Sequence, residues 1–168
     1  MMNLEGKIAL VTGASRGIGR AIAEQLVSRG ATVIGTATSE NGAAAIGEYL
    51  GEHGKGLALN VTDPESIAQV LKTINDEFGA LDILVNNAGI TRDTLLMRMK
   101  DDEWTDIMDT NLTSIFRLSK AVLRGMMKKR NGRIINVGSV VGTMGNAGQT
   151  NYAAAKAGVI GFTKSMAR

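Results

Sequence analysis

The sequence contains no cysteine, one proline and one histidine among its 168 residues. The absence of cysteine excludes disulfide bonds and thiolate catalysis, and it is typical of a reducing compartment. The single histidine, His53, lies in a Gly-Glu-His-Gly segment and is expected to be a solvated loop residue. It argues against a catalytic triad and against a zinc site, so we predict that the chain binds no metal.

Strong net charge and long apolar runs are also missing. The formal net charge is +3 and is spread along the chain, which does not indicate a nucleic-acid partner. No apolar run approaches the roughly 20 residues that a membrane-spanning helix needs. The first residues, Met-Met-Asn-Leu-Glu-Gly-Lys, do not have the form of a signal peptide. We therefore expect a cytoplasmic protein with no membrane partner.

Glycine, by contrast, is abundant, with 21 residues, and strand-like segments alternate with helix-like ones. Short apolar segments predict the strands, and stretches with apolar residues at helical spacing predict the helices. The expected strands are 8–11, 32–36, 56–59, 81–85 and 133–137; the expected helices run from the turn at 12–19 to Gly30, over 41–50, from Pro64 to Phe78, over 102–130 and over 150–168. The start of the third helix is marked by Asp63 as a cap and Pro64 in the first position.

This alternation, with apolar strands and no hairpin signals, predicts the α/β fold class. Parallel strands joined by helices form a Rossmann-type doubly wound parallel sheet in three α/β/α layers, with right-handed crossovers. We expect a single domain over residues 1–168 in which strands 1–5 have the order 3-2-1-4-5 and helices cover both faces of the sheet.

The first expected strand ends in a glycine-rich turn, Thr12-Gly13-Ala14-Ser15-Arg16-Gly17-Ile18-Gly19. Its spacing is G-x-x-x-G-x-G, which differs from the usual dinucleotide pattern G-x-G-x-x-G. The physical requirement is similar, because the chain must turn tightly and bring its backbone close to a pyrophosphate at a helix N-terminus. The turn alone is weak evidence, since glycine also serves packing, but its place after the first strand favours dinucleotide binding.

Two further turns are expected beside this one. Strands 1 and 4 are neighbours at the switch point of the sheet, where ligands bind beyond the carboxyl ends of the strands. Strand 4 ends in Asn86-Asn87-Ala88-Gly89, and strand 5 leads to Ser139. The asparagines can also serve as turn residues that bond their own backbone. We expect them to do this and to line a ligand site.

The second strand indicates which dinucleotide is bound. A site for NAD usually has Asp or Glu at the end of this strand, where the carboxylate bonds the ribose hydroxyls. Here the strand ends in Gly35-Thr36-Ala37-Thr38-Ser39, with no acid before Glu40, while Arg16 lies in the glycine-rich turn. A cation and hydroxyl groups suit a 2′-phosphate, so we predict NADP(H). The alternative for Arg16 is an exposed turn residue without a ligand.

The segment from Asn151 to Lys156 places a phenol and an ammonium four residues apart, and therefore on one face of a helix. A free tyrosine has a pKa of about 10, and a nearby cation favours the phenolate, which makes proton donation feasible nearer neutral pH. If Ser139 lies beside Tyr152, a substrate carbonyl oxygen could be held between two donors. The alternative is that these residues are ordinary core and surface positions of the helix.

Taken together, the turn at 12–19, Asn86-Asn87-Ala88-Gly89, Asn111, Ser139, Tyr152 and Lys156 resemble the motifs of the short-chain dehydrogenase/reductase family. The resemblance covers essentially the whole chain. Within the family, Gly89-Ile90-Thr91-Arg92-Asp93 and Gly138-Ser139-Val140-Val141-Gly142 are most similar to the bacterial enzymes that reduce 3-oxoacyl groups on acyl carrier protein. The resemblance implies that NADPH reduces such a thioester to its 3-hydroxyacyl form in fatty acid biosynthesis.

The resemblance also implies roles for individual residues. Tyr152 would donate the proton, Lys156 would bond the nicotinamide ribose and lower the phenol pKa, Ser139 would orient the substrate carbonyl, and Asn111 would hold a water of the proton relay. The cofactor residues that it implies are Gly13, Ala14, Ser15, Arg16, Gly17, Ile18, Gly19, Thr38, Asn60, Val61, Asn87, Ala88, Gly89, Tyr152 and Lys156. Asn60 departs from the aspartate that is common in the family, which weakens its assignment to adenine.

The resemblance implies two kinds of partner, namely the acyl carrier protein that bears the substrate and other copies of the chain in a homotetramer. Lys128-Lys129-Arg130 offers a basic surface for an acidic carrier protein.

Family members continue beyond the position of Arg168, so the C-terminal part of the family fold is expected to be missing. Such a chain would leave a sheet edge and apolar helix faces uncovered. Two alternatives therefore stay open: an inactive fragment that binds nucleotide or self-associates, and a reductase of another ketone such as acetoacetyl-coenzyme A.

Overall fold

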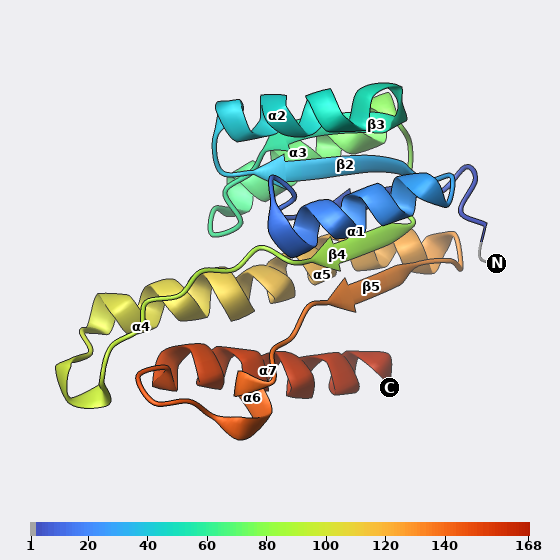
Figure 1. The fold of residues 1–168 in the computed structure, drawn as a ribbon. Helices are drawn as coiled ribbons and strands as arrows, with labels where there is room; N and C mark the ends of the chain where they lie inside the picture. The colour runs from blue at the N-terminus through green and yellow to red at the C-terminus, as the bar shows by residue number, and fades with distance from the viewer. Residues whose placement is uncertain (1–2) are drawn as a thin grey trace.

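A five-stranded parallel sheet forms the centre of the chain in a computed structural model, which describes residues 3–168 (Figure 1). The strand order is β3-β2-β1-β4-β5, which confirms the predicted order. In the middle strand, Ala9 is in register with Val33 of β2 and Ile83 of β4. The elements are β1 Ile8–Val11, α1 Gly17–Ser28, β2 Thr32–Ala37, α2 Glu40–Leu50, η1 Gly51–His53, β3 Gly54–Ala58, α3 Pro64–Glu77, β4 Ile83–Asn86, η2 Leu96–Arg98, α4 Asp101–Met108, η3 Asp109–Thr113, α5 Ser114–Lys128, β5 Arg133–Asn136, α6 Val141–Met144 and α7 Thr150–Ala167.

Local sequence signals account for most of these boundaries. The Asp63 side chain accepts a hydrogen bond from the Glu65 amide at 3.0 Å, and Pro64 opens α3, as predicted. After α1, the chain turns at Gly30, which has φ +98° and donates its amide to Val27. Such left-handed backbone is easily reached only by glycine, so the residue separates the helix from β2.

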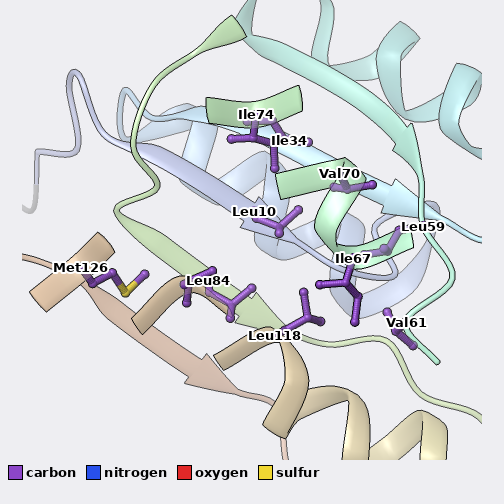
Figure 2. Packing of buried hydrophobic residues seen from close by; sticks show 11 residues of the cluster. Leu10, Ile34, Leu59, Val61, Ile67, Val70, Ile74, Leu84, Leu118 and Met126 are labelled. Atoms are coloured by element: carbon purple, nitrogen blue, oxygen red, sulfur yellow. The ribbon is translucent and has the colours of Figure 1, made fainter. Parts of the chain in front are cut away.

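The hydrophobic core has two parts, one on each face of the sheet. On one face, Leu10 and Leu84 of the sheet pack with Ile74 of α3 and Leu118 of α5 (Figure 2). On the other face, buried residues of β1 and β2 pack with α1 and α2, where Ile46 is fully buried. The three-layer architecture therefore follows from strands that are apolar on both sides.

The helix that the sequence predicts over 102–130 is divided in the structure. A π-helical segment, η3, separates α4 from α5. Its residue Asn111 is 1% exposed and bonds the backbone of Ile90 through both side-chain atoms. This buried contact accompanies the widened turn, and the apolar spacing gives no sign of it. The short helices α6, η1 and η2 were also not predicted.

The sheet is least covered at its edge strand β5. Ile135 of this edge strand is 49% exposed, whereas the strands β1 and β4 are almost wholly buried. Apolar residues on the outer sides of α5 and α7 are exposed as well, namely Phe116, Leu123, Met127 and Ile160. These are the uncovered edge and helix faces that the sequence analysis expected.

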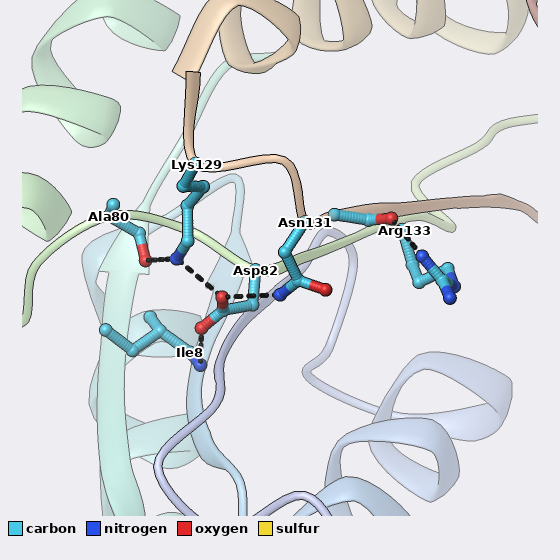
Figure 3. Close-up of polar contacts among 7 residues, drawn as sticks. Ile8, Ala80, Asp82, Lys129, Asn131 and Arg133 are labelled. Atoms are coloured by element: carbon cyan, nitrogen blue, oxygen red, sulfur yellow. Dashed lines mark hydrogen bonds and ion pairs between the residues drawn. The ribbon is translucent and has the colours of Figure 1, made fainter. Parts of the chain in front are cut away.

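The end of α5 is fastened to the sheet by a buried carboxylate, Asp82, which precedes β4 (Figure 3). The Lys129 ammonium and the Asn131 amide donate to its Oδ1 at 2.6 and 3.3 Å, and the Ile8 amide donates to Oδ2 at 2.9 Å. Burial alone would raise the pKa of Asp82, but the hydrogen bonds from Lys129 and Ile8 and the positive charges of Lys129 and Lys7 hold it below its ordinary value of 3.8.

Asp82→Asn should therefore lower the free energy of unfolding by about 1–3 kcal/mol at pH 7, because Lys129 loses a charged acceptor. A carboxylate with a lowered pKa stabilises the fold above pH 3.8, and this contribution is lost as the pH falls toward the lower folded value. The difference between the two proteins in urea unfolding should thus shrink below pH 3.8. Asp76→Asn is the control, since this carboxylate is 57% exposed and should give a difference below about 1 kcal/mol. A pH-independent difference would contradict the prediction.

Candidate active site

A groove crosses the carboxyl ends of β1, β2 and β4. It consists of two hollows, of about 360 and 440 Å³. Because both are lined by Arg16, Asn87, Gly89 and Ile90, they form one continuous depression. The groove lies at the switch point between β2 and β4 on either side of β1, where ligands of such sheets bind.

The glycine-rich turn permits a close backbone approach at two positions. Gly13 has φ +64°, and a Cβ there would lie 3.0 Å from the Ala88 Cα in the turn after β4. A Cβ on Gly19 would collide with the Gly13 carbonyl oxygen. Between them, α1 begins at Gly17 without a side-chain cap on its first amides in the described residues. Uncapped amides at a helix N-terminus suit a phosphate group.

Two polar side chains join the turn after β1 to the turn after β4. The Thr12 hydroxyl accepts hydrogen bonds from the amides of Asn87 and Ala88, at 3.0 and 2.9 Å. In return, Asn87 Nδ2 donates to the carbonyls of Thr12 and Gly13, at 3.2 and 3.0 Å. Both side chains therefore fix the floor of the groove. Thr12 was not among the predicted site residues, although it stands in the glycine-rich motif.

Tyr49, which was not among the predicted site residues, supports the same turn from α2. Its hydroxyl donates to the Ala14 carbonyl at 2.7 Å, and the Arg20 guanidinium lies 4.4 Å from the centroid of its ring. Burial raises the pKa of Tyr49 above its ordinary value, so the phenol keeps its proton and the hydrogen bond. Ala14 is fully buried and shapes the turn from behind.

One end of the groove has the chemistry of a 2′-phosphate site. Arg16, Thr38 and Ser39 line it together with Val61. No Asp or Glu belongs to the lining of either hollow. A guanidinium and hydroxyl groups without a carboxylate suit an additional phosphate better than free ribose hydroxyls. The residues present therefore fit NADP(H).

Asn60, expected beside the adenine, does not line the groove. Its Oδ1 accepts hydrogen bonds from the backbone amide and the hydroxyl of Thr62, at 3.0 and 2.7 Å. The backbone amide of Asn60 donates to the Ser66 hydroxyl oxygen. The side chain thus organises the turn before α3. Of the other expected cofactor residues, Ala14, Gly17 and Gly19 form the turn without lining the hollows, while Gly13, Ser15, Arg16, Ile18, Thr38, Val61, Asn87, Ala88, Gly89, Tyr152 and Lys156 line them.

The other end of the groove contains the predicted phenol and ammonium. Tyr152 and Lys156, both on α7, line it with Val137 and Gly138. The Lys156 Nζ donates to the Val137 carbonyl at 3.0 Å and lies 5.7 Å from the centroid of the Tyr152 ring. Burial lowers the pKa of Lys156, because the charged ammonium is poorly solvated there. The ammonium is thus poised between the phenol and the chain after β5.

Ser139 and Asn111 line neither hollow, but each adjoins a residue that does. Ser139 is half-buried and follows Gly138; its oxygen accepts the Val141 amide at 3.1 Å, which leaves the hydroxyl hydrogen free to donate. Asn111 accepts from the Ile90 amide at 2.9 Å and donates to the Ile90 carbonyl at 2.8 Å. These two bonds use one N–H group and one oxygen lone pair of the amide, and the water-holding role of Asn111 stays a prediction.

Over residues 3–168, no helix combines the length and hydropathy needed to cross a bilayer. The same residues contain no group of three or more His, Asp or Glu side chains placed to hold a metal ion.

Comparisons with known proteins agree with this geometry. Residues 7–168 match the family described as short chain dehydrogenase, so the chain belongs to this family of oxidoreductases. It is 89% identical over 167 residues to the 3-oxoacyl-acyl-carrier-protein reductase FabG of Vibrio harveyi. The enzymes of the same name from Vibrio cholerae and Escherichia coli are 84% and 78% identical to this chain over the same length. Each match covers 99% of this chain and 68% of the relative.

Proposed function

We propose that this chain carries the NADPH-dependent reduction of 3-oxoacyl groups on acyl carrier protein, a step of fatty acid biosynthesis. The observation that carries the proposal is that Tyr152 and Lys156 line the same groove as Arg16 and Asn87. A proton donor and a dinucleotide cradle therefore face one space. The relatives that are 78–89% identical to the chain bear the name of this activity.

The residues of the groove divide the chemistry among themselves. When bound, NADPH supplies a hydride to the carbonyl carbon of the 3-oxoacyl group. Tyr152 donates its phenolic proton to the carbonyl oxygen, so that the ketone becomes a hydroxyl group. Lys156 stabilises the phenolate that remains, and Ser139 donates its free hydroxyl hydrogen to the same carbonyl oxygen. Arg16 and Thr38 would hold the 2′-phosphate, and the turn at Gly13 would accommodate the pyrophosphate.

NADPH oxidation at 340 nm tests this function. The assay compares a 3-oxoacyl group on acyl carrier protein with acetoacetyl-coenzyme A, and it uses this chain beside one extended to the full length of the relatives. Turnover with higher kcat/KM on the carrier-bound substrate supports the proposal. A preference for the coenzyme A thioester would favour a reductase of another ketone. NADPH binding without turnover, while the longer chain is active, would favour the inactive fragment.

We also propose that the carrier protein docks at the basic end of α5. Lys128 and Arg130 are exposed, and Arg124 is exposed one turn earlier on the same helix. Lys129, in contrast, is bonded to Asp82 and is not available for a partner. The docking surface therefore consists of Arg124, Lys128 and Arg130, and a charge reversal at Lys129 would disturb the fold instead.

Reversing Lys128 and Arg130 to Glu should raise KM for the carrier-bound substrate about tenfold at low salt, because interfacial charges steer an acidic partner. The effect should fade with added salt, and kcat/KM for acetoacetyl-coenzyme A should not change. Lys72→Glu, a charge reversal on the exposed side of α3, is the control. Equal rates for the reversed and unaltered proteins on carrier-bound substrate would rule out docking at this surface.

A homotetramer and a cytoplasmic location complete the proposal. Exposed apolar residues on α5 and α7, such as Phe116 and Ile160, support self-association, because such faces are seldom left in water. Sedimentation of the purified chain tests the oligomeric state.

A further inference from the structure

An irregular segment that follows β4 runs along the groove and contacts the start of α7, the helix that carries Tyr152. Residues 87–94, here called the strap, follow β4 and contain no helix or strand. The strap borders the groove from Asn87 to Arg92. Side chains of other elements hold it at successive positions, so its conformation is set by tertiary contacts and not by a regular backbone pattern.

Three elements hold the strap. The Thr12 hydroxyl accepts the first two amides, as described above. Asn111 binds both the amide and the carbonyl of Ile90. The last part is held by the segment that opens α7: the Thr94 amide donates to the Gly148 carbonyl at 2.9 Å, and Gln149 Nε2 donates to Asp93 Oδ1 at 3.1 Å.

Asn151 makes the most buried of the contacts between the strap and α7. It is 0% exposed, and its Nδ2 donates to the Arg92 carbonyl of the strap at 3.0 Å and to the Glu103 carbonyl of α4 at 3.1 Å. Its Oδ1 accepts the backbone amide of Tyr152 at 2.8 Å. One side chain thus joins the strap, α4 and the residue that carries the catalytic phenol.

We propose that Asn151 is a positioning residue for the reaction: its side chain holds the backbone of Tyr152 next to the strap at Arg92. This inference rests on the proposed function. Its physical basis is that the Asn151 side chain makes three hydrogen bonds, and both of its N–H groups donate to carbonyls that no other described side chain binds. Loss of the amide would let the strap and Tyr152 move apart. The first residues of the strap, at Asn87, would stay in place, because their hydrogen bonds with Thr12 and the bond of Asn111 to Ile90 do not involve Asn151.

Asn151→Asp tests the role, because aspartate keeps the size of the side chain and an acceptor for the Tyr152 amide but removes both N–H donors. Asn151→Ala is the second variant, since it places no carboxylate against the two carbonyls. Both should lower kcat about 10- to 100-fold at equal folded fraction, while the Kd for NADPH stays within about threefold. Thr163→Val is the matched control: Thr163 lies on α7, as Asn151 does, and the substitution removes its hydrogen bond with Asn136 of β5 without touching the strap. It should lower stability and leave kcat unchanged.

Two readouts separate this inference from the proposed function. Hydrogen exchange of the Thr94 amide should accelerate at least tenfold in both Asn151 variants and not in the control. The fluorescence of Trp104, the only tryptophan and the neighbour of Glu103, should shift in the same two variants. If the unaltered chain turns over no substrate, the proposed function fails, whereas the contact stands or falls with exchange and fluorescence. Exchange, fluorescence and kcat that follow the control would overturn the role of Asn151.

Discussion

Tyr152→Phe should lower kcat about 100- to 10 000-fold, because the phenolic proton is the one that the carbonyl oxygen receives. The ring is retained, so the groove keeps its shape, and NADPH should bind with nearly unchanged Kd. Stopped-flow measurement of NADPH oxidation, together with fluorescence titration of NADPH, separates the two quantities. A fall in NADPH affinity with unchanged kcat would mean that Tyr152 serves binding only.

The second tyrosine offers a matched comparison for this result. Tyr49→Phe removes the hydroxyl that donates to the Ala14 carbonyl at 2.7 Å, behind the glycine-rich turn. Its loss should weaken NADPH binding and leave the proton transfer intact, so the Kd should rise while kcat at saturating NADPH stays near that of the unaltered protein. Each substitution removes one tyrosine hydroxyl, Tyr152→Phe at the catalytic end of the groove and Tyr49→Phe behind the glycine-rich turn. Opposite effects on kcat and Kd would assign catalysis to one end and cofactor placement to the other.

Thr38→Asp should weaken NADPH binding about 30- to 100-fold, since we expect a carboxylate facing a 2′-phosphate to cost about 2–3 kcal/mol. The same carboxylate can bond the free ribose hydroxyls of NADH, so the preference between the two cofactors should move toward NADH. Dissociation constants for both cofactors measure the shift. Thr73→Asp introduces the same charge on the exposed side of α3, away from the groove, and should alter neither constant. NADH binding as tight as NADPH binding in the unaltered chain would end the NADP(H) assignment.

The sequence was most informative where structure depends on local patterns. Apolar strand segments and turn glycines predicted the order of the five strands, and the groove forms where Gly13, Asn87 and Tyr152 were expected to meet. Such features follow from neighbours along the chain and from the topology of parallel sheets. They need no knowledge of which side chain bonds which partner.

Polar side chains with distant partners were harder to interpret. Asn60 and Asn87 are both asparagines in turns after strands, yet one bonds Thr62 beside it and the other bonds the turn 74 residues away. Asn151 was not predicted to have a role of its own, because its partner at Arg92 lies 59 residues away. Spacing along the chain does not reveal these pairings, since each depends on how the turns come together in three dimensions.

The π-helical segment η3 has a consequence for the direction in which the two flanking helices face. In an uninterrupted α-helix, Ile107 and Leu118 would project within roughly 20° of each other, because eleven residues make slightly more than three full turns. The extra residue of the widened turn shifts the helical phase by roughly 100°. Leu118 accordingly packs in the core beneath the sheet, whereas α4 lies against α7. The consecutive helical segments α4, η3 and α5 therefore turn different sides toward the sheet and toward α7, the helix that carries Tyr152.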